Sequence, residues 1–132
     1  MIIELYRSYN DLCGEIAWLE DQIAFTTKEQ EDWWIGGRLF HTVPMENAAA
    51  RYDKLEEKLV RMRKALRIIR AHKAKVDELI LYFDSLEHQI AYLKYCKGKT
   101  YQEIADELGY TYQYVRLLHS KMKREYEIYQ NV

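Results

Sequence analysis

Apolar residues in the first part of the chain follow the spacing of a helix with one apolar face. They recur at intervals of three and four residues, at Ile2, Leu5, Tyr9, Leu12, Ile16, Leu19 and Ile23. A helix brings such positions onto one side, so the pattern predicts a helix with a single seam. The pattern stops at Thr26, and the next segment holds adjacent tryptophans, adjacent glycines and the only proline. We therefore predict a loop over residues 26–45, with Trp33 and Trp34 folded back onto a core.

A second apolar seam begins after Glu46 and keeps the same spacing as far as Phe83. Its members are Ala48, Tyr52, Leu55, Leu59, Met62, Leu66, Ile69, Val76, Ile80 and Phe83. Both seams repeat every 3.5 residues on average, which favours antiparallel pairing of the two helices in the manner of a coiled coil. Lys73 stands where an apolar residue is due, so it either snorkels to water or marks a change of partner. The longer second helix needs company at its far end, either a second copy of the chain or the carboxy-terminal region.

Charge is distributed unevenly along the chain, although the net charge is only −1. Residues 1–50 carry three basic and nine acidic groups, residues 51–75 carry ten and three, residues 76–84 carry none and three, and residues 85–132 carry seven and six. The basic segment of the second helix either attracts phosphate or is a solvated helix face. We expect acidic residues of the first helix to lie near basic residues of the second: Glu15 and Glu20 near Arg51, Lys58 and Arg63.

The last part of the chain carries the most specific pattern. Three helices are predicted there, from Ser85 to Gly98, from Thr100 to Gly109, and from Thr111 to about Tyr129. Thr100 followed by Glu103 is a capping box, in which each side chain bonds the other residue's backbone N–H. Two short helices approach closely where Ala105 is small, and Gly109 supplies the left-handed residue of the turn. Together these features predict a helix-turn-helix.

The outward face of the third helix holds most of the candidate DNA-binding residues. The full set is Tyr101, Thr111, Tyr112, Gln113, Arg116, Leu117, Ser120, Lys121, Lys123 and Arg124. Gln and Arg side chains pair bidentately with adenine and guanine edges in the major groove, and the later cations suit phosphates. Tyr101 and Tyr112 lie near helix starts, where a hydroxyl can donate to a phosphate. We expect sequence-specific binding to double-stranded DNA.

The stretch from Leu86 to Lys123 resembles region four of the bacterial sigma factors. The likeness rests above all on residues 98–109, GKTYQEIADELG, and residues 114–121, YVRLLHSK. With its helical amino-terminal part, the whole chain resembles phage-encoded transcriptional regulators of the ArpU and RinA kind. This resemblance implies transcriptional control of late phage genes, with host RNA polymerase as a further partner. Carried over by position, the base-reading residues of the sigma module fall on Gln113, Arg116 and Leu117.

Enzyme chemistry is not indicated. The four histidines are scattered, at His41, His72, His88 and His119, and no cluster has metal-ligand spacing. We expect no cofactor and no metal, and we expect the last two histidines to lie on helix surfaces. The two cysteines are far apart in sequence, which predicts reduced core thiols. No apolar run is long enough for a membrane span, so we expect a cytoplasmic protein.

The expected fold is all-α: a helical hairpin over residues 1–83 that serves oligomerisation, followed by a helix-turn-helix domain over residues 84–132. Three functions stay open. A transcription regulator comes first, as a homodimer or as a monomer that relies on RNA polymerase. A phage DNA-packaging recognition subunit, of the small terminase kind, also joins a helix-turn-helix to helical oligomerisation elements. A module that binds RNA polymerase without reading DNA is the third.

Overall fold

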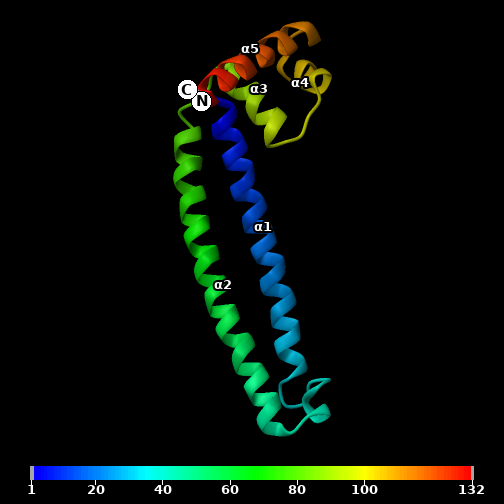
Figure 1. Cartoon of the computed structure of the whole chain (residues 1–132). Helices are drawn as coiled ribbons and strands as arrows, with labels where there is room; N and C mark the ends of the chain where they lie inside the picture. The colour runs from blue at the N-terminus through cyan, green and yellow to red at the C-terminus, as the bar shows by residue number, and fades with distance from the viewer. Residues whose placement is uncertain (1, 132) are drawn as a thin grey trace. The chain divides into compact units, whose positions relative to one another are not determined.

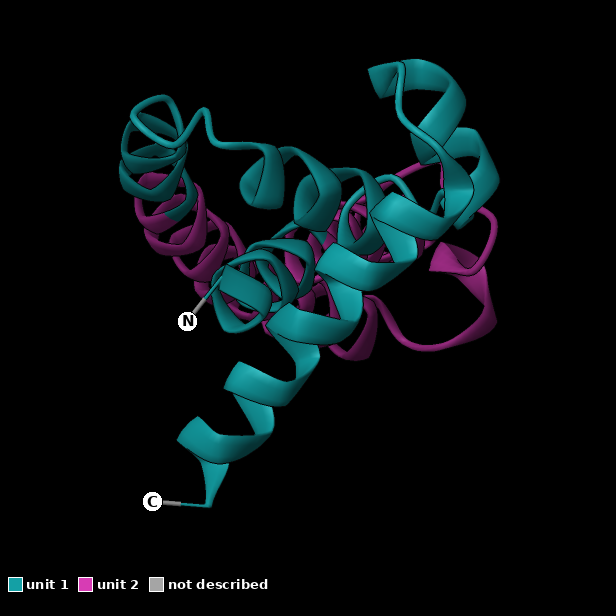
Figure 2. Cartoon of the chain, turned by 90° about the horizontal axis from the view of Figure 1, so that it is seen from above, with its two compact units in different colours: residues 1–13, 73–132 teal, residues 14–72 magenta. Residues whose placement is uncertain are grey.

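The computed structural model describes residues 2–131, and within that range it contains helices and no strand (Figure 1). The all-α prediction is confirmed. The elements are α1 (Ile2–Asp32), a 3-10 turn (Phe40–Thr42), α2 (Met45–Ile80), α3 (Leu86–Tyr95), α4 (Tyr101–Leu108) and α5 (Tyr112–Gln130). They form two compact units (Figure 2). The hairpin unit comprises Gly14–His72, and the helix-turn-helix unit comprises the residues up to Cys13 and those from Lys73 onward.

The hairpin unit is an antiparallel pair of helices. Glu20 of α1 accepts a hydrogen bond from Arg70 of α2 at 2.5 Å. Further along α1, the amide Nε2 of Gln30 donates to Oε2 of Glu56 at 2.6 Å. Later residues of α1 therefore contact earlier residues of α2, so the two helices run antiparallel. The predicted seam is buried between them, most completely at Leu19, Ala48, Leu59 and Leu66.

The first helix is longer than predicted, because the seam continues in polar residues. Thr26 and Gln30 follow Ile23 at intervals of three and four, and both are buried. Gln30 is held there by its bond to Glu56, whereas the hydroxyl of Thr26 has no hydrogen-bond partner among the described residues. The predicted loop start at residue 26 is wrong: α1 ends at Asp32, just before Gly36 adopts a left-handed φ of 87°.

The charged residues that meet across the hairpin also differ from the prediction. Glu20 pairs with Arg70 instead of with the basic residues that the sequence favoured. The Arg51 guanidinium lies 4.5 Å from the centroid of the Trp33 ring, and Arg63 faces Glu56 of its own helix at 3.9 Å. The two ion pairs are about half exposed, so each contributes little to stability.

Both tryptophans after α1 contact α2, but they do not enter a core as predicted, since Trp34 is 56% exposed. The Trp34 ring lies 5.0 Å from that of Tyr52, measured between centroids, and Trp33 receives the cation of Arg51. They border an apolar pocket of about 290 Å³. Its lining consists of Trp33, Trp34, Ile35, Phe40, Met45, Ala49, Tyr52 and Asp53.

The core of the helix-turn-helix unit includes the start of the chain. Its buried residues are Ile3, Ile90, Leu93, Ile104, Ala105, Val115 and Met122. Tyr6 is also buried, and its hydroxyl lies 3.0 Å from Nδ1 of His88. The Arg7 guanidinium lies 5.6 Å from the Tyr95 ring of α3 and 6.0 Å from the Tyr126 ring of α5. The first turns of α1 thus pack with residues that the sequence assigned to a separate domain.

The far end of α2 also finds its partner within this unit. The Tyr9 hydroxyl donates to Asp77 at 2.7 Å, and Lys73 donates to the same carboxylate at 3.0 Å. The two bonds hold the pKa of Asp77 below its ordinary value, and the bond to Asp77 raises the pKa of Tyr9 to about 12. Beyond α2, Phe83 stacks on the His88 ring at 4.6 Å. Lys73 is the first residue of α2 in this unit, and its ammonium lies 5.3 Å from the centroid of the Tyr9 ring, so α1 is still a partner of α2 at this position.

Candidate nucleic-acid interface

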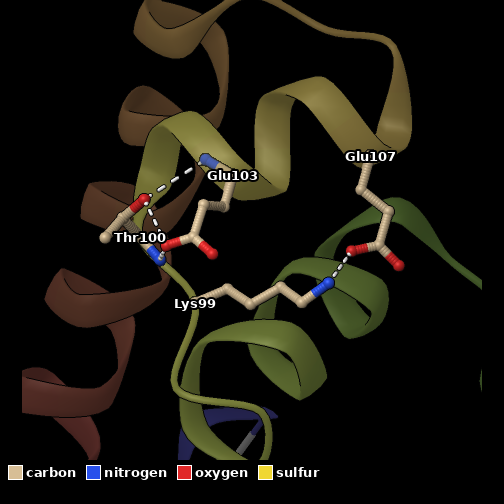
Figure 3. Close-up of polar contacts among 4 residues, drawn as sticks. All are labelled: Lys99, Thr100, Glu103 and Glu107. Atoms are coloured by element: carbon tan, nitrogen blue, oxygen red, sulfur yellow. Dashed lines mark hydrogen bonds and ion pairs between the residues drawn. The ribbon is translucent and has the colours of Figure 1, made fainter.

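The start of α4 is fixed by the predicted capping box, drawn in Figure 3. The Thr100 hydroxyl accepts from the Glu103 backbone N–H at 3.2 Å, and the Glu103 carboxylate accepts from the Thr100 N–H at 3.3 Å. Lys99 pairs with Glu107 in the last turn of the same helix (Figure 3). Asp106 accepts from Gln102 at 2.9 Å. All three carboxylates of α4 therefore have a partner within the unit.

The turn between α4 and α5 has the geometry that the sequence predicts. Gly109 is left-handed, with φ 78° and ψ 30°, and its N–H donates to the Ala105 carbonyl at 2.9 Å. Ala105 is buried where α4 approaches the core. Two residues after the glycine, the Thr111 hydroxyl accepts from the Tyr114 N–H at 3.2 Å and caps α5. A helix-turn-helix is formed by these contacts, and Thr111 serves as a cap.

One side of α5 is buried and the opposite side is open. Val115, His119 and Met122 face the core. The remaining predicted site residues of this helix are exposed: Tyr112, Gln113, Arg116, Leu117, Ser120, Lys121, Lys123 and Arg124. Residues 109–124 carry four basic groups and no acidic group. The outward face of α5, defined by these exposed residues, is therefore cationic and suited to a polyanion.

Tyr101 does not present its hydroxyl to solvent as the sequence suggested. The hydroxyl lies 2.6 Å from Nδ1 of His119, and the ring is half-buried. On the other side of the imidazole, the Tyr95 hydroxyl lies 2.7 Å from Nε2. His119 therefore joins α3, α4 and α5 through two hydrogen bonds, and Tyr101 acts in this network.

The position predicted for His119 is wrong, because the residue is only 3% exposed. Burial lowers the pKa of His119 to about 4, with smaller contributions from Lys123 and Lys94. The imidazole is thus neutral at physiological pH, with one N–H donor and one acceptor nitrogen for its two tyrosine partners. The spacing already contained a signal, because His119 lies four residues after Val115 and three before Met122.

A pair of exposed tyrosines at the start of α5 was not singled out by the sequence. The Tyr110 and Tyr114 rings lie 5.3 Å apart with an interplanar angle of 31°. Tyr112 instead packs edge-on against Tyr101 at 5.9 Å. The spacing of four residues across a helix start is the signal that could have revealed the first pair.

The structure of residues 2–131 bears on three further sequence predictions, which concern metal-ligand groups, membrane-spanning helices and cysteines. No group of three or more His, Cys, Asp or Glu side chains lies in a position to hold a metal ion there. In the same range, no helix combines the length and apolarity that a membrane crossing requires. Cys13 and Cys96 are free and half-buried. Burial raises the pKa of the Cys96 thiol to about 11, and its Sγ donates to the Tyr6 carbonyl at 3.6 Å.

No protein-family model, no curated protein and no solved structure matches this chain. We therefore base its function on the helix-turn-helix and on the outward face of α5.

Proposed function

We propose that this protein binds double-stranded DNA sequence-specifically and regulates transcription. The proposal rests on the outward face of α5, which is cationic. This helix directly follows the turn of the helix-turn-helix. In such folds the second helix lies in the major groove and its first turns meet the base edges. The Thr111 cap and Gly109 fix where α5 begins, so they also fix which side chains reach the bases.

Roles follow from side-chain chemistry. Gln113 and Arg116 lie in the first two turns of α5 and are exposed, so they are our candidates for adenine and guanine edges. Lys121, Lys123 and Arg124 lie one to three turns further on and suit phosphates. The positive end of the α5 dipole adds to the attraction for phosphate near Tyr112.

The wider role rests on the resemblance to sigma region four and to phage regulators of the ArpU and RinA kind. It supports regulation of late phage genes in the cytoplasm, with contact to host RNA polymerase. We propose a binding protein and not an enzyme, without cofactor or metal. One of the three carboxylates of α4, that of Glu107, is paired with a cation, Lys99, which reduces its repulsion of DNA phosphates.

We also propose that the protein acts as a homodimer through the hairpin unit. Trp18 and Phe25 lie seven residues apart on α1, so they share one face, and each is 62% exposed. Burying two large aromatic side chains against a second copy contributes about 1.5 to 3 kcal/mol each. The far end of α2 does not motivate the dimer, since Phe83 already stacks on His88.

Selection of bound fragments from random DNA, with and without bacterial RNA polymerase, tests the function. A recurring motif selected by the protein alone supports direct reading of DNA. A motif that appears only when polymerase is present supports joint recognition. Binding to polymerase without any enriched motif would overturn the proposal in favour of an interaction module.

A further inference from the structure

Leu117 occupies the centre of the outward face of α5. It lies two residues from both Val115 and His119, which is about 200° of helical rotation from each of these buried positions. Its side chain is 61% exposed. The residues one turn away on the same side are all exposed: Gln113, Ser120 and Lys121 are polar or charged, and Tyr114 carries an aromatic ring with a hydroxyl. Leu117 is therefore an aliphatic side chain among polar, cationic and aromatic neighbours.

The charge around Leu117 determines what can cover it. Arg116 precedes it and Lys121 follows one turn later, with no acidic residue anywhere between positions 109 and 124. An apolar protein surface would leave these cations without counter-charge, whereas the major groove of DNA is lined by phosphates. Within that groove, one base presents an apolar group at its edge. It is thymine, through its C5 methyl.

We propose that Leu117 contacts the C5 methyl of a thymine, so that the recognised site requires an A·T base pair at that position. This inference rests on the proposed DNA binding and adds which base the centre of α5 reads. The contact buries one methyl group against the leucine side chain. Since a buried methyl-sized group is worth about 0.8 kcal/mol, losing it should weaken binding about fourfold.

Replacement of thymine by deoxyuridine, which lacks only the C5 methyl, tests the contact. In the selected site each thymine is replaced in turn, and the dissociation constant of the full-length protein is measured by fluorescence anisotropy. We expect one replacement per half-site to weaken binding about fourfold. For Leu117→Ala we expect weaker binding to the thymine site and no further loss at that deoxyuridine position. Because Leu117 is exposed, the variant should keep the helical circular dichroism of the wild type.

Ile128→Ala is the matched control. Ile128 is an aliphatic residue of the same helix, 67% exposed, and lies eleven residues beyond Leu117. This variant should keep the full deoxyuridine penalty. A penalty that persists unchanged in Leu117→Ala would overturn the contact while leaving DNA binding intact, and so would a scan without any sensitive thymine. Failure to select any DNA would instead remove the proposed function together with this inference.

Discussion

The hydroxyl of Tyr101 lies 2.6 Å from Nδ1 of His119, which fastens the first residue of α4 to the middle of α5. Tyr95 of α3 bonds the other ring nitrogen. Recognition by a helix-turn-helix requires that α5 keep a fixed angle to the rest of the fold. One neutral imidazole therefore helps to set the orientation of the proposed reading helix.

His119 should make the stability of the protein depend on pH. Its pKa is about 4 when folded, below the ordinary value of 6.5, so the unfolded chain binds the proton more tightly. The contribution is complete well above pH 6.5 and is lost as the pH falls through 6.5 towards 4, amounting to about 2 kcal/mol between pH 7.5 and 5. Urea unfolding at pH 7.5 and 5.0 measures it. His119→Gln should show a smaller fall in the free energy of unfolding between the two pH values. His88 is present in both proteins. Equal falls would mean that His119 titrates near its ordinary pKa.

Arg116→Ala should weaken specific DNA binding by about 1 to 3 kcal/mol and relax sequence preference at one position. The reason is the loss of a bidentate contact to guanine. Lys123→Ala provides the contrast, because a lost phosphate contact should weaken all sequences alike and reduce the salt slope by about 1. Binding titrations at several salt concentrations separate the two. An unchanged selected motif with Arg116→Ala would exclude Arg116 from base reading.

Gly109→Ala should destabilise the protein by about 1 to 2 kcal/mol, because the residue is left-handed with φ 78°. An added Cβ would meet no atom within 4 Å, so the expected cost is one of backbone conformation. Gly14 also has open space for a Cβ but lies within α1 without a positive φ. Gly14→Ala should therefore stabilise by up to about 1 kcal/mol. Thermal unfolding of both variants checks the opposite signs, and equal effects would contradict the turn assignment.

Thr26→Val should stabilise the hairpin unit by about 1 kcal/mol. The Thr26 hydroxyl is buried without a hydrogen-bond partner among the described residues, and valine keeps the shape while removing the polar atom. Thr27→Val is the control, because the Thr27 hydroxyl donates to the Ile23 carbonyl at 2.7 Å. That variant should be neutral or slightly destabilised. Chemical denaturation distinguishes them, and destabilisation by Thr26→Val would show that the hydroxyl is satisfied in solution.

Light scattering should give a mass near twice the 16.0 kDa of the chain. Phe25→Glu should shift the protein towards monomer, because a carboxylate would replace an aromatic side chain at the proposed interface. Ile128→Glu places the same charge on an exposed aliphatic residue of the other unit and should leave the mass unchanged. A wild-type mass near that of one chain would contradict the dimer. A ring of many chains would favour the DNA-packaging alternative.

Local patterns in the sequence were enough to predict the helix-turn-helix. The capping box of Thr100 and Glu103, the left-handed Gly109 and the Thr111 cap each involve residues at most a few positions apart. Such interactions are decided by backbone geometry within one turn, so neighbouring residue types reveal them. The three- and four-residue spacing likewise predicted the two apolar seams, because residues at these intervals lie on the same face of a helix. Two such seams in succession favoured the pairing of the helices.

Only the tertiary structure decided which buried positions are polar and which distant segments share a core. Thr26 and Gln30 continue the seam, although Gln30 needs Glu56 from another helix for its hydrogen bond. Ile3 joins the core of a unit formed mostly by residues more than seventy positions away. His119 is buried because Tyr95 and Tyr101 satisfy its two ring nitrogens. Burial of a polar group depends on partners supplied by other elements, and no local pattern specifies those partners.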